Sequence, residues 1–336
     1  MLCRSCFGVA LAVLVWLTAA SADGEGEAPS AHGAVAGERC RVIVSTDIGG
    51  SDSDDFQSMA HFLVYADTMD VEGLISSPPE GGRAAHIHEV LDAYEADYAR
   101  LARSAKAYPL PGRLRTLVKQ GAMDPAPAAG FGEATEGSRW IVERGRATDE
   151  RPVYVLVWGS ITDVAQAVHD APDVKRRLRV YSIGSWNTAQ DRSARNYLYE
   201  QHEDLWWIES DSTFRGMYVG GNQAGDLENR AFLDAHVRGH GALGRLLVEK
   251  RSAIKMGDTP SVLYLLAGVP GDPAGEHWGG RFVATGHGPQ YWTDDPHPEW
   301  AEGRFNGAKT VSRWREPFLR DWQRRMERLA PADAAE

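Results

Sequence analysis

Short, continuous apolar runs alternate along this chain with longer segments that carry apolar residues at helical spacing. Apolar runs bounded by turn residues predict strands over residues 41–45, 71–76, 153–157, 178–183 and 205–208. Helical spacing predicts helices over residues 55–65, 84–105, 137–144, 161–169, 230–237, 243–249 and 311–329. The alternation of strands and helices predicts an α/β fold with an open, mostly parallel Rossmann-like sheet and helices on both faces.

Two longer segments lack a clear period. Residues 108–132 contain several prolines and glycines and predict a long loop with one helical turn. Residues 268–297 are rich in Gly, Pro, Trp and Asp and predict irregular structure over the edge of the sheet. Loops of this length inside a compact domain are often functional, so the second segment is a candidate substrate-binding region.

The amino terminus has the pattern of an export signal. Arg4 precedes an apolar run from Phe7 to Ala20, and Ala20-Ser21-Ala22 offers a small-residue cleavage site. We predict a signal peptide at 1–22, a flexible leader at 23–38, one domain at 39–330 and a disordered tail at 331–336. The alternative is a signal anchor, but the apolar run is short for a membrane span. The mature chain is therefore expected to be secreted or periplasmic, with no stable membrane span.

The charge balance restricts the partners of the protein. The chain has 36 basic and 47 acidic residues and a formal net charge of −11, and loss of the signal peptide removes Arg4 but no acid. Such an acidic chain is not expected to bind nucleic acid, which requires an excess of Lys and Arg. Cys3 and Cys6 leave with the signal peptide, so Cys40 has no intramolecular disulfide partner. The sequence leaves open whether the chain forms a homo-oligomer.

An acidic loop follows the first predicted strand. Asp47 comes directly after the strand, two glycines follow, and Asp52, Asp54 and Asp55 precede the first helical pattern. In a parallel sheet this loop lies at the carboxyl edge of the strands, where open α/β folds bind ligands. Crowded carboxylates repel one another, and a hard cation with oxygen ligands would relieve that repulsion. The alternative is a helix that merely begins with surface acids. An EF-hand is excluded, because its sixth position would be Gln57 and its twelfth Leu63.

This loop resembles the opening motif of the nucleoside hydrolase superfamily, D-x-D-P-G-x-D-D after the first strand. The resemblance implies that Asp47 and Asp55 bind calcium (Ca²⁺) and that Asp54 contacts ribose. Three departures stand out: Ser45 replaces the first Asp, Ile48 replaces the Pro, and the turn is three residues longer. Because of that longer turn, Asp52 remains an alternative to Asp54.

Two later segments extend the resemblance in the expected order. Residues 155–165 resemble the family's strand followed by G-P-L-T-N, which implies that the carbonyl of Thr162 binds calcium. Residues 255–262 resemble the family's late H-D-P-L-A-V segment, which makes Asp258 the last carboxylate ligand. Residues 206–210, 214–218, 256–261 and 278–282 resemble a secreted bacterial branch of nucleoside-hydrolase-like proteins, some of them called cellulose-binding.

The resemblance implies a calcium-dependent hydrolase of N-glycosyl bonds in a nucleoside or another ribosyl or glycan substrate. Asp47 would be the general base that takes the proton from a metal-bound water, and attack would invert the anomeric carbon. Asn187 and Asn196 match the family's sugar-binding asparagines, although both could simply form turns. Ala194 stands where the family has a sugar-binding Glu, and Gly257 where it has a His. These losses favour a rival interpretation, a weakly active or non-catalytic carbohydrate-binding protein on the same scaffold. A third interpretation, a different metal-dependent hydrolase acting on polysaccharides, fits the export signal and the tryptophans.

Aromatic residues gather in predicted strand-end loops. Four of the eleven tryptophans are in such loops, and they either stack on a sugar or base or fill the loop layer: Trp158, Trp186, Trp278 and Trp292. We expect Trp278, Arg281 and Tyr291 to line the mouth of the site and bind substrate. With the family's late His missing, the acid for the leaving group is sought at His86, His88 or His277.

Overall fold

The computed structural model describes residues 39–50, 52–79 and 81–330. The predicted signal peptide, the leader and the tail lie outside the described residues. Eight strands form one sheet in the order β3-β2-β1-β4-β5-β6-β8-β7. Their bounds are β1 Arg41–Thr46, β2 Asp70–Ser76, β3 Val118–Gln120, β4 Val153–Val157, β5 Leu178–Ile183, β6 Trp207–Ser210, β7 Phe282–Ala284 and β8 Tyr291–Asp294.

Helices connect and cover these strands. The α-helices are α1 Asp54–Val64, α2 Ala84–Ser104, α3 Pro111–Thr116, α4 Glu136–Gly145, α5 Thr162–Asp170, α6 Trp186–Gln190, α7 Arg192–Gln201, α8 Asn229–His236, α9 Gly241–Lys250, α10 Thr259–Leu266, α11 Lys309–Ser312 and α12 Arg315–Met326. Short 3₁₀ helices lie at η1 Ala66–Thr68, η2 Pro172–Arg177, η3 Thr213–Met217, η4 Gly225–Leu227, η5 Pro298–Trp300 and η6 Glu327–Leu329. No helix in the described part of the chain is both long and apolar enough to span a membrane.

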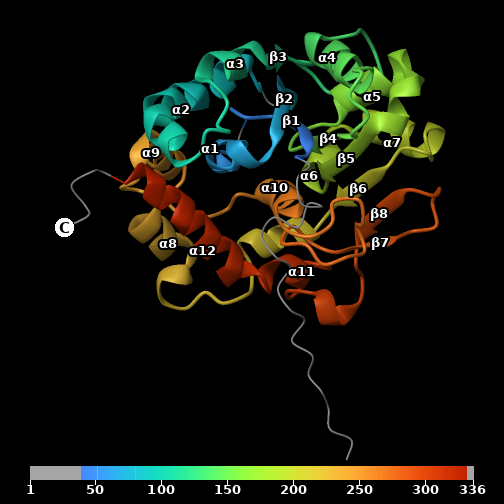
Figure 1. Ribbon diagram of the computed structural model, residues 1–336. Coiled ribbons are helices and arrows are strands. Elements are labelled where there is room, and N and C mark those ends of the chain that lie inside the picture. Colours follow the sequence, from blue (N-terminus) through green and yellow to red (C-terminus); the bar gives the residue numbers. More distant parts are fainter. Residues whose placement is uncertain (1–38, 51, 80, 331–336) are drawn as a thin grey trace, which may run out of the picture.

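The sheet is parallel except where β7 pairs antiparallel with β8. Figure 1 shows α2 and α9 on one side of the sheet and α4, α5 and α7 on the other. The predicted α/β class, with an open, mostly parallel sheet covered on both faces, is confirmed. Strand order reverses between β1 and β4, and a crevice at the carboxyl edge of the sheet is expected at that switch point.

Alternate residues of the strands supply two separate cores, as the period of two requires. Val42 and Val44 of β1 join the core formed with α1, α2, α9, α10 and α12. Ile43, between them, joins the core formed with α4, α5 and α7. Because every residue of β1 and β4 is buried, these central strands read as continuous apolar runs in the sequence.

Several elements differ from the prediction. Residues 108–132 contain β3 as well as the helical turn α3, and residues 268–297 contain β7 and β8 instead of only irregular structure. Helices α6, α7 and α10 were not predicted, and the expected helix 311–329 is divided at Arg313 and Trp314 into α11 and α12, with η6 completing it. Strands β3, β7 and β8 were not predicted because they have only three or four residues, too few to establish a period.

Candidate active site

The loop after β1 carries Asp47 to the carboxyl edge of the sheet. The N–H of Gly50 donates to the carbonyl of Asp47 at 2.9 Å and closes a tight turn. Gly49 has φ +93°, and a Cβ there would lie only 1.9 Å from Nδ1 of His86, so both conformation and space require glycine. His86 in turn contacts the carbonyl of Ile48 at 3.1 Å, which anchors α2 against the loop.

Three carboxylates from two chain segments meet beside this turn. Asp54 and Asp55 occupy the first turn of α1, where the helix dipole favours acids, and Asp258 directly precedes α10. One carboxylate oxygen from each lies within 4.8 Å of the others. The Thr46 hydroxyl donates to Asp55, and the carboxyl of Asp47 also shares a hydrogen bond with Asp55. The acidic loop is therefore part of a convergent cluster and not a row of surface acids.

Burial raises the pKa of every acid in this cluster. Burial and repulsion from Asp55 raise the pKa of Asp54 to about 6, and burial raises that of Asp55 to about 6. Burial and the charge of Asp55 raise the pKa of Asp47 and of Asp258 well above the usual value. Ionising these acids together is therefore unfavourable in the metal-free protein, and a bound cation would stabilise their ionised forms.

The geometry of the cluster fits a hard divalent cation. Calcium takes oxygen ligands at about 2.3–2.6 Å, so two ligands on opposite sides of the ion stand about 5 Å apart. The oxygens of Asp54, Asp55 and Asp258 satisfy that limit without rearrangement. Carboxylate-only donors also favour calcium or magnesium over metals that prefer histidine or cysteine.

A cavity of about 300 Å³ opens above the cluster. It is lined by Asp47, Gly50, Asp52, Asp54, Asp55, Trp158, Ile183, Gly184, Ser185, Trp186, Asn187, Phe214, Arg215, Tyr218, Lys255, Gly257 and Asp258. Asp52 lies at its rim, 38% exposed, and pairs with Lys255 and with Arg251 at 3.2 Å. The two candidates for the ribose-contacting acid therefore differ in position. Asp54 belongs to the cluster, whereas Asp52 lies outside it and is paired with cations.

The wall opposite the acidic cluster comes from the ends of β5 and β6. Nδ2 of Asn187 donates to the carbonyls of Trp158 at 2.7 Å and Ile183 at 3.1 Å. The neighbouring Trp186 is 44% exposed, an unusual value for a large aromatic side chain. Among described non-glycine residues, two have positive φ: Ser185 at 59° lines this cavity, and Met256 at 34° lies between the lining residues Lys255 and Gly257. Strained backbone of this kind is often found at functional sites.

Thr162 begins α5 and does not line the cavity. Its hydroxyl donates to Asp191 at 2.5 Å, and Asp191 caps α7 through the N–H of Ala194. The same turn does approach the acidic loop, because a Cβ on Gly159 would lie 2.8 Å from Cβ of Asp47. The role of the Thr162 carbonyl as a metal ligand stays a prediction.

Four residues assigned to substrate lie away from this cavity. Asn196 borders a separate surface hollow beside α7. Trp278 is only 4% exposed and belongs to the core, Arg281 pairs with Asp295 at 2.6 Å, and Tyr291 donates to Glu209 at 2.5 Å. The expected mouth over the site is therefore corrected: residues 268–297 add two strands to the sheet and pack against it.

The candidate acids for the leaving group are also placed by the structure. Both ring nitrogens of buried His277 contact backbone carbonyls, those of Tyr264 at 3.0 Å and Asp272 at 2.9 Å. His86 contacts the carbonyl of Ile48, and neither it nor His88 lines the cavity. Sequence reasoning passed over other lining residues: Phe214, Arg215, Tyr218 and Lys255. Residues 214–218 and 255–262 resemble segments of nucleoside-hydrolase-like proteins, and this resemblance could have marked them as part of the site. The sequence did not show which of their side chains face the cavity.

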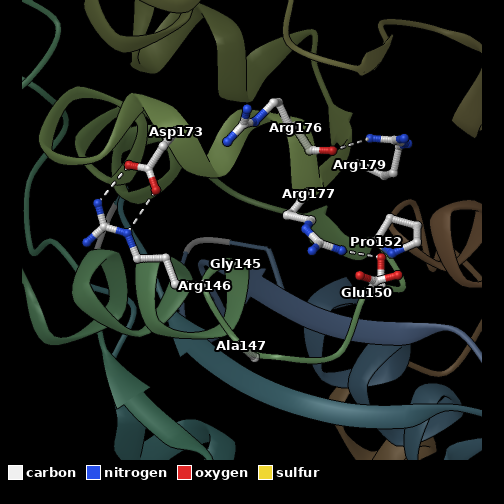
Figure 2. Close-up of a pocket in the computed structure, with 9 residues that line it drawn as sticks. All are labelled: Gly145, Arg146, Ala147, Glu150, Pro152, Asp173, Arg176, Arg177 and Arg179. Carbon is white, nitrogen blue, oxygen red and sulfur yellow. Dashed lines mark hydrogen bonds and ion pairs between the residues drawn. The ribbon is translucent and has the colours of Figure 1, made fainter.

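A second hollow, of about 490 Å³, lies at the opposite edge of the sheet (Figure 2). It is lined by Gly145, Arg146, Ala147, Glu150, Pro152, Asp173, Arg176, Arg177 and Arg179. Pro152 and Arg177 directly precede β4 and β5, so the hollow lies at the amino ends of the strands. Arg146 pairs with Asp173 at 2.7 Å, and the hollow has neither an acidic cluster nor an aromatic lining. The first cavity is therefore the candidate active site.

Comparison with known proteins agrees with this placement. Residues 41–282 match the family model described as "Cellulose-binding Sde182, nucleoside hydrolase-like domain". The chain belongs to this Sde182 family. The matched range includes the acidic loop, Asp258 and the whole lining of the first cavity. No curated protein sequence matches the chain.

Solved structures show the same fold. A nucleoside hydrolase-related protein from Saccharophagus degradans, associated with carbohydrate metabolism, is 26% identical, with a TM-score of 0.70 over 88% of this chain and 73% of that one. A plant nucleoside hydrolase is 12% identical, with a TM-score of 0.52 over 88% of this chain and all of that one. The effector protein XopQ, complexed with adenosine diphosphate ribose, is 12% identical, with a TM-score of 0.54 over 87% and 94%. The two latter likenesses concern the fold alone.

Proposed function

We propose that this Sde182-family protein is a calcium-dependent hydrolase of N-glycosyl bonds of the ribosyl type. One observation carries the proposal: Asp54, Asp55 and Asp258 converge within 4.8 Å beside Asp47, at the switch point of a nucleoside hydrolase-like fold. Carboxylates so close and so buried require a cation to remain ionised together. Burying several carboxylates together is unfavourable unless they bind a cation, so the cluster itself supports a metal-binding role.

Each acid has a distinct proposed task. Calcium bound by Asp47, Asp55, Asp258 and the Thr162 carbonyl would orient and acidify a water and hold sugar hydroxyls. Asp47 would accept the proton of that water. Asp54 would accept a hydrogen bond from a ribose hydroxyl. Its carboxylate accepts the N–H of Gly257 at 3.4 Å and lies 3.9 Å from Lys255, and these contacts leave it acceptor capacity.

The opposite wall would orient the sugar and the leaving group. Both hydrogens of Asn187 Nδ2 are engaged by the carbonyls of Trp158 and Ile183, which fixes the amide. None of the described residues donates to Oδ1 of Asn187, so that atom can accept from a substrate hydroxyl. Trp186, exposed at the cavity, would stack on a substrate ring, an interaction of about 1–3 kcal/mol in comparable base–aromatic contacts. Trp186 thus takes the stacking role that the sequence suggested for Trp278.

The departure of the leaving group has no histidine to assist it in this cavity. Gly257 stands where the resembling segment of the nucleoside hydrolases has a histidine. The ring nitrogens of His277 both contact backbone carbonyls. Protonation from solvent, or a leaving group stable as an anion, is consistent with this lining. Substrates with good leaving groups, such as nitrophenyl ribosides, should therefore react faster than nucleosides.

A second candidate function is carbohydrate binding without hydrolysis. The family description includes cellulose binding, and the exposed Trp186 with its polar neighbours is the kind of surface on which a sugar ring stacks. The missing histidine also favours this candidate. It does not account for the carboxylate cluster as directly as a metal-dependent reaction does.

One experiment separates the two candidates. The purified protein, with calcium and with chelator, is tested for release of reducing sugar from nucleosides and nitrophenyl ribosides, and for binding to cellulose and soluble glycans. Calcium-dependent release that is lost in Asp47→Asn supports the hydrolase. Glycan binding without release, unchanged by chelator, supports the binding protein.

Export is part of the same proposal. Residues 1–22 have the pattern of a signal peptide, and cleavage after Ala22 would deliver the protein to a compartment where calcium is abundant. Amino-terminal sequencing of the protein recovered from the culture medium or periplasm tests this, and a mature chain that still begins at Met1 would contradict it.

A further inference from the structure

Arg215 is a cation in the candidate active site that no acid among the described residues neutralises. It belongs to η3 and lines the cavity with the acidic cluster. Its guanidinium donates to the carbonyl of Asp211 at 2.6 Å and to the hydroxyl of Ser185 at 2.9 Å. Within the described ranges it forms no ion pair with a carboxylate. Two contacts use only part of the five N–H donors of a guanidinium.

The neighbouring cations are different. Lys255 and Arg251 both pair with Asp52 at the rim. Arg195, next to the cavity wall, pairs with Glu209 at 2.6 Å. In a chain with 47 acidic and 36 basic residues, an arginine without a carboxylate partner inside a polar cavity is unexpected. Its charge remains available to a ligand.

The guanidinium of Arg215 is also held in place. It packs over the ring of Phe214 at 4.4 Å and that of Phe305 at 4.9 Å. The carboxylate of Asp211, the nearest acid in sequence, accepts the N–H of Ser185 at 2.5 Å. That bond stabilises Ser185 at φ 59°, and the Ser185 hydroxyl in turn fixes Arg215. A planar donor fork fixed in this way suits a carboxylate or phosphate.

The cavity therefore has two electrostatic sides. Asp54 and Asp258 belong to the acidic side, and Arg215 with Ser185 and Trp186 to the other. Tyr218 also lines the cavity. A neutral nucleoside or sugar would use the acidic side and leave Arg215 without a counter-charge.

We propose that Arg215 binds an anionic group, a phosphate or a carboxylate, on the glycosyl substrate of this cavity. This inference rests on the proposed function for the identity of the site as a glycosyl-binding site. It narrows the substrate class from nucleosides in general to anionic glycosides, of which ribosyl phosphates and uronic acid glycosides are the two chemical sources. Trp186 would pack on the ring beside the charge.

Matched ligand pairs test the inference. With calcium present, calorimetry compares ribose with ribose 5-phosphate, and glucose with glucuronate, for wild type, Arg215→Gln, Arg215→Lys and the control Arg251→Gln. One anionic member should bind wild type about ten- to a hundredfold tighter than its neutral partner, as expected for charge-assisted hydrogen bonds. The preference should vanish in Arg215→Gln, persist in part in Arg215→Lys, remain in Arg251→Gln and shrink at high salt. The pair that shows this preference identifies the anionic group as a phosphate or as a carboxylate.

The outcomes distinguish this inference from the proposed function. Equal binding of charged and neutral members, together with hydrolysis of neutral nucleosides, overturns the role of Arg215 and leaves the hydrolase intact. An Arg215-dependent preference without hydrolysis of any ribosyl compound, neutral or 5′-phosphorylated, supports the inference and overturns the hydrolase. Binding of no member of either pair overturns the role of Arg215, and the release of free sugar from ribosyl compounds then decides separately whether the hydrolase holds. If Arg215→Gln fails to fold, judged by circular dichroism, the Arg215→Lys variant and the salt dependence of wild type decide.

Discussion

Replacing Asp54 with asparagine should stabilise the metal-free protein at neutral pH and weaken its stabilisation by calcium, because one negative charge beside the proposed ion is lost. The substitution keeps the size of the side chain and leaves an oxygen to accept the N–H of Gly257. It removes one charge from a buried cluster in which Asp54, Asp55 and Asp258 lie within 4.8 Å. The change therefore tests whether these acids are held together at an electrostatic cost.

The magnitude follows from the pKa of Asp54, which burial and Asp55 raise from 3.8 to about 6. A carboxyl group whose pKa is raised by folding favours the folded state fully below pH 3.8 and loses that contribution as the pH rises through about 6. At pH 7.5 the difference corresponds to about 3 kcal/mol, at about 1.4 kcal/mol per unit. We expect Asp54→Asn to recover roughly 1–3 kcal/mol of this, since neighbouring acids also adjust.

Thermal unfolding in chelator is the assay. A gain of that size should raise the Tm at pH 7.5 by about 3–8 °C, because a chain of this size shifts by a few degrees per kcal/mol. At pH 5 the advantage over wild type should shrink, because wild-type Asp54 is then largely protonated. With calcium at a hundred times the wild-type Kd, wild type should gain about 2.7 kcal/mol, and the variant, which keeps the proposed ligands but lacks one nearby charge, should gain less.

Asp52→Asn is the matched control. Asp52 pairs with Arg251 and Lys255 at the rim, so its loss should leave the Tm in chelator unchanged or slightly lower and preserve the response to calcium. A fall in Tm for Asp54→Asn in chelator at pH 7.5, or an equal rise for Asp52→Asn, would refute the idea that the cluster is electrostatically strained.

Three further substitutions test the assignment of the site. Asp47→Asn should lower any hydrolysis by at least about a hundredfold with unchanged circular dichroism, because the proposed base and a ligand charge are lost; comparable turnover at equal folded fraction would remove Asp47 from the mechanism. Trp186→Ala should raise KM or weaken ligand binding with little change in Tm, since Trp186 is 44% exposed at the cavity. Trp278→Ala should do the reverse, destabilising the protein by about 3–5 kcal/mol, as loss of a core tryptophan does. If the two tryptophan variants behave alike, the cavity does not bind the ligand.

The sheet and its acidic edge were predictable because they depend on local pattern. Continuous apolar runs in the central strands, followed by glycines and acids, specify both the strands and the edge at which the acids gather. The choice between Asp52 and Asp54 was not predictable. Two acids separated by one residue give the same local signal, and only Arg251 and Lys255, some 200 residues later, distinguish them.

The late segment shows the opposite difficulty. A tryptophan in a run rich in glycine gives the same sequence signal whether it closes over a ligand or packs into the core. Trp278 packs in the core, because residues 282–284 and 291–294 extend the sheet and the segment around them is buried against it. Trp186 and Arg215 face the cavity because β5 and β6 are neighbours in the sheet, a relation that the linear sequence does not state.

The most direct test of the central claim measures the release of free sugar from a nitrophenyl riboside and from nucleosides by the purified protein. The protein is stripped with chelator, assayed, and assayed again after calcium is restored. We predict no release in chelator, recovery with calcium to the level of untreated protein, and no recovery in Asp47→Asn. Release that continues undiminished in chelator, or that is equal in wild type and Asp47→Asn, would contradict a calcium-dependent hydrolase at this cluster.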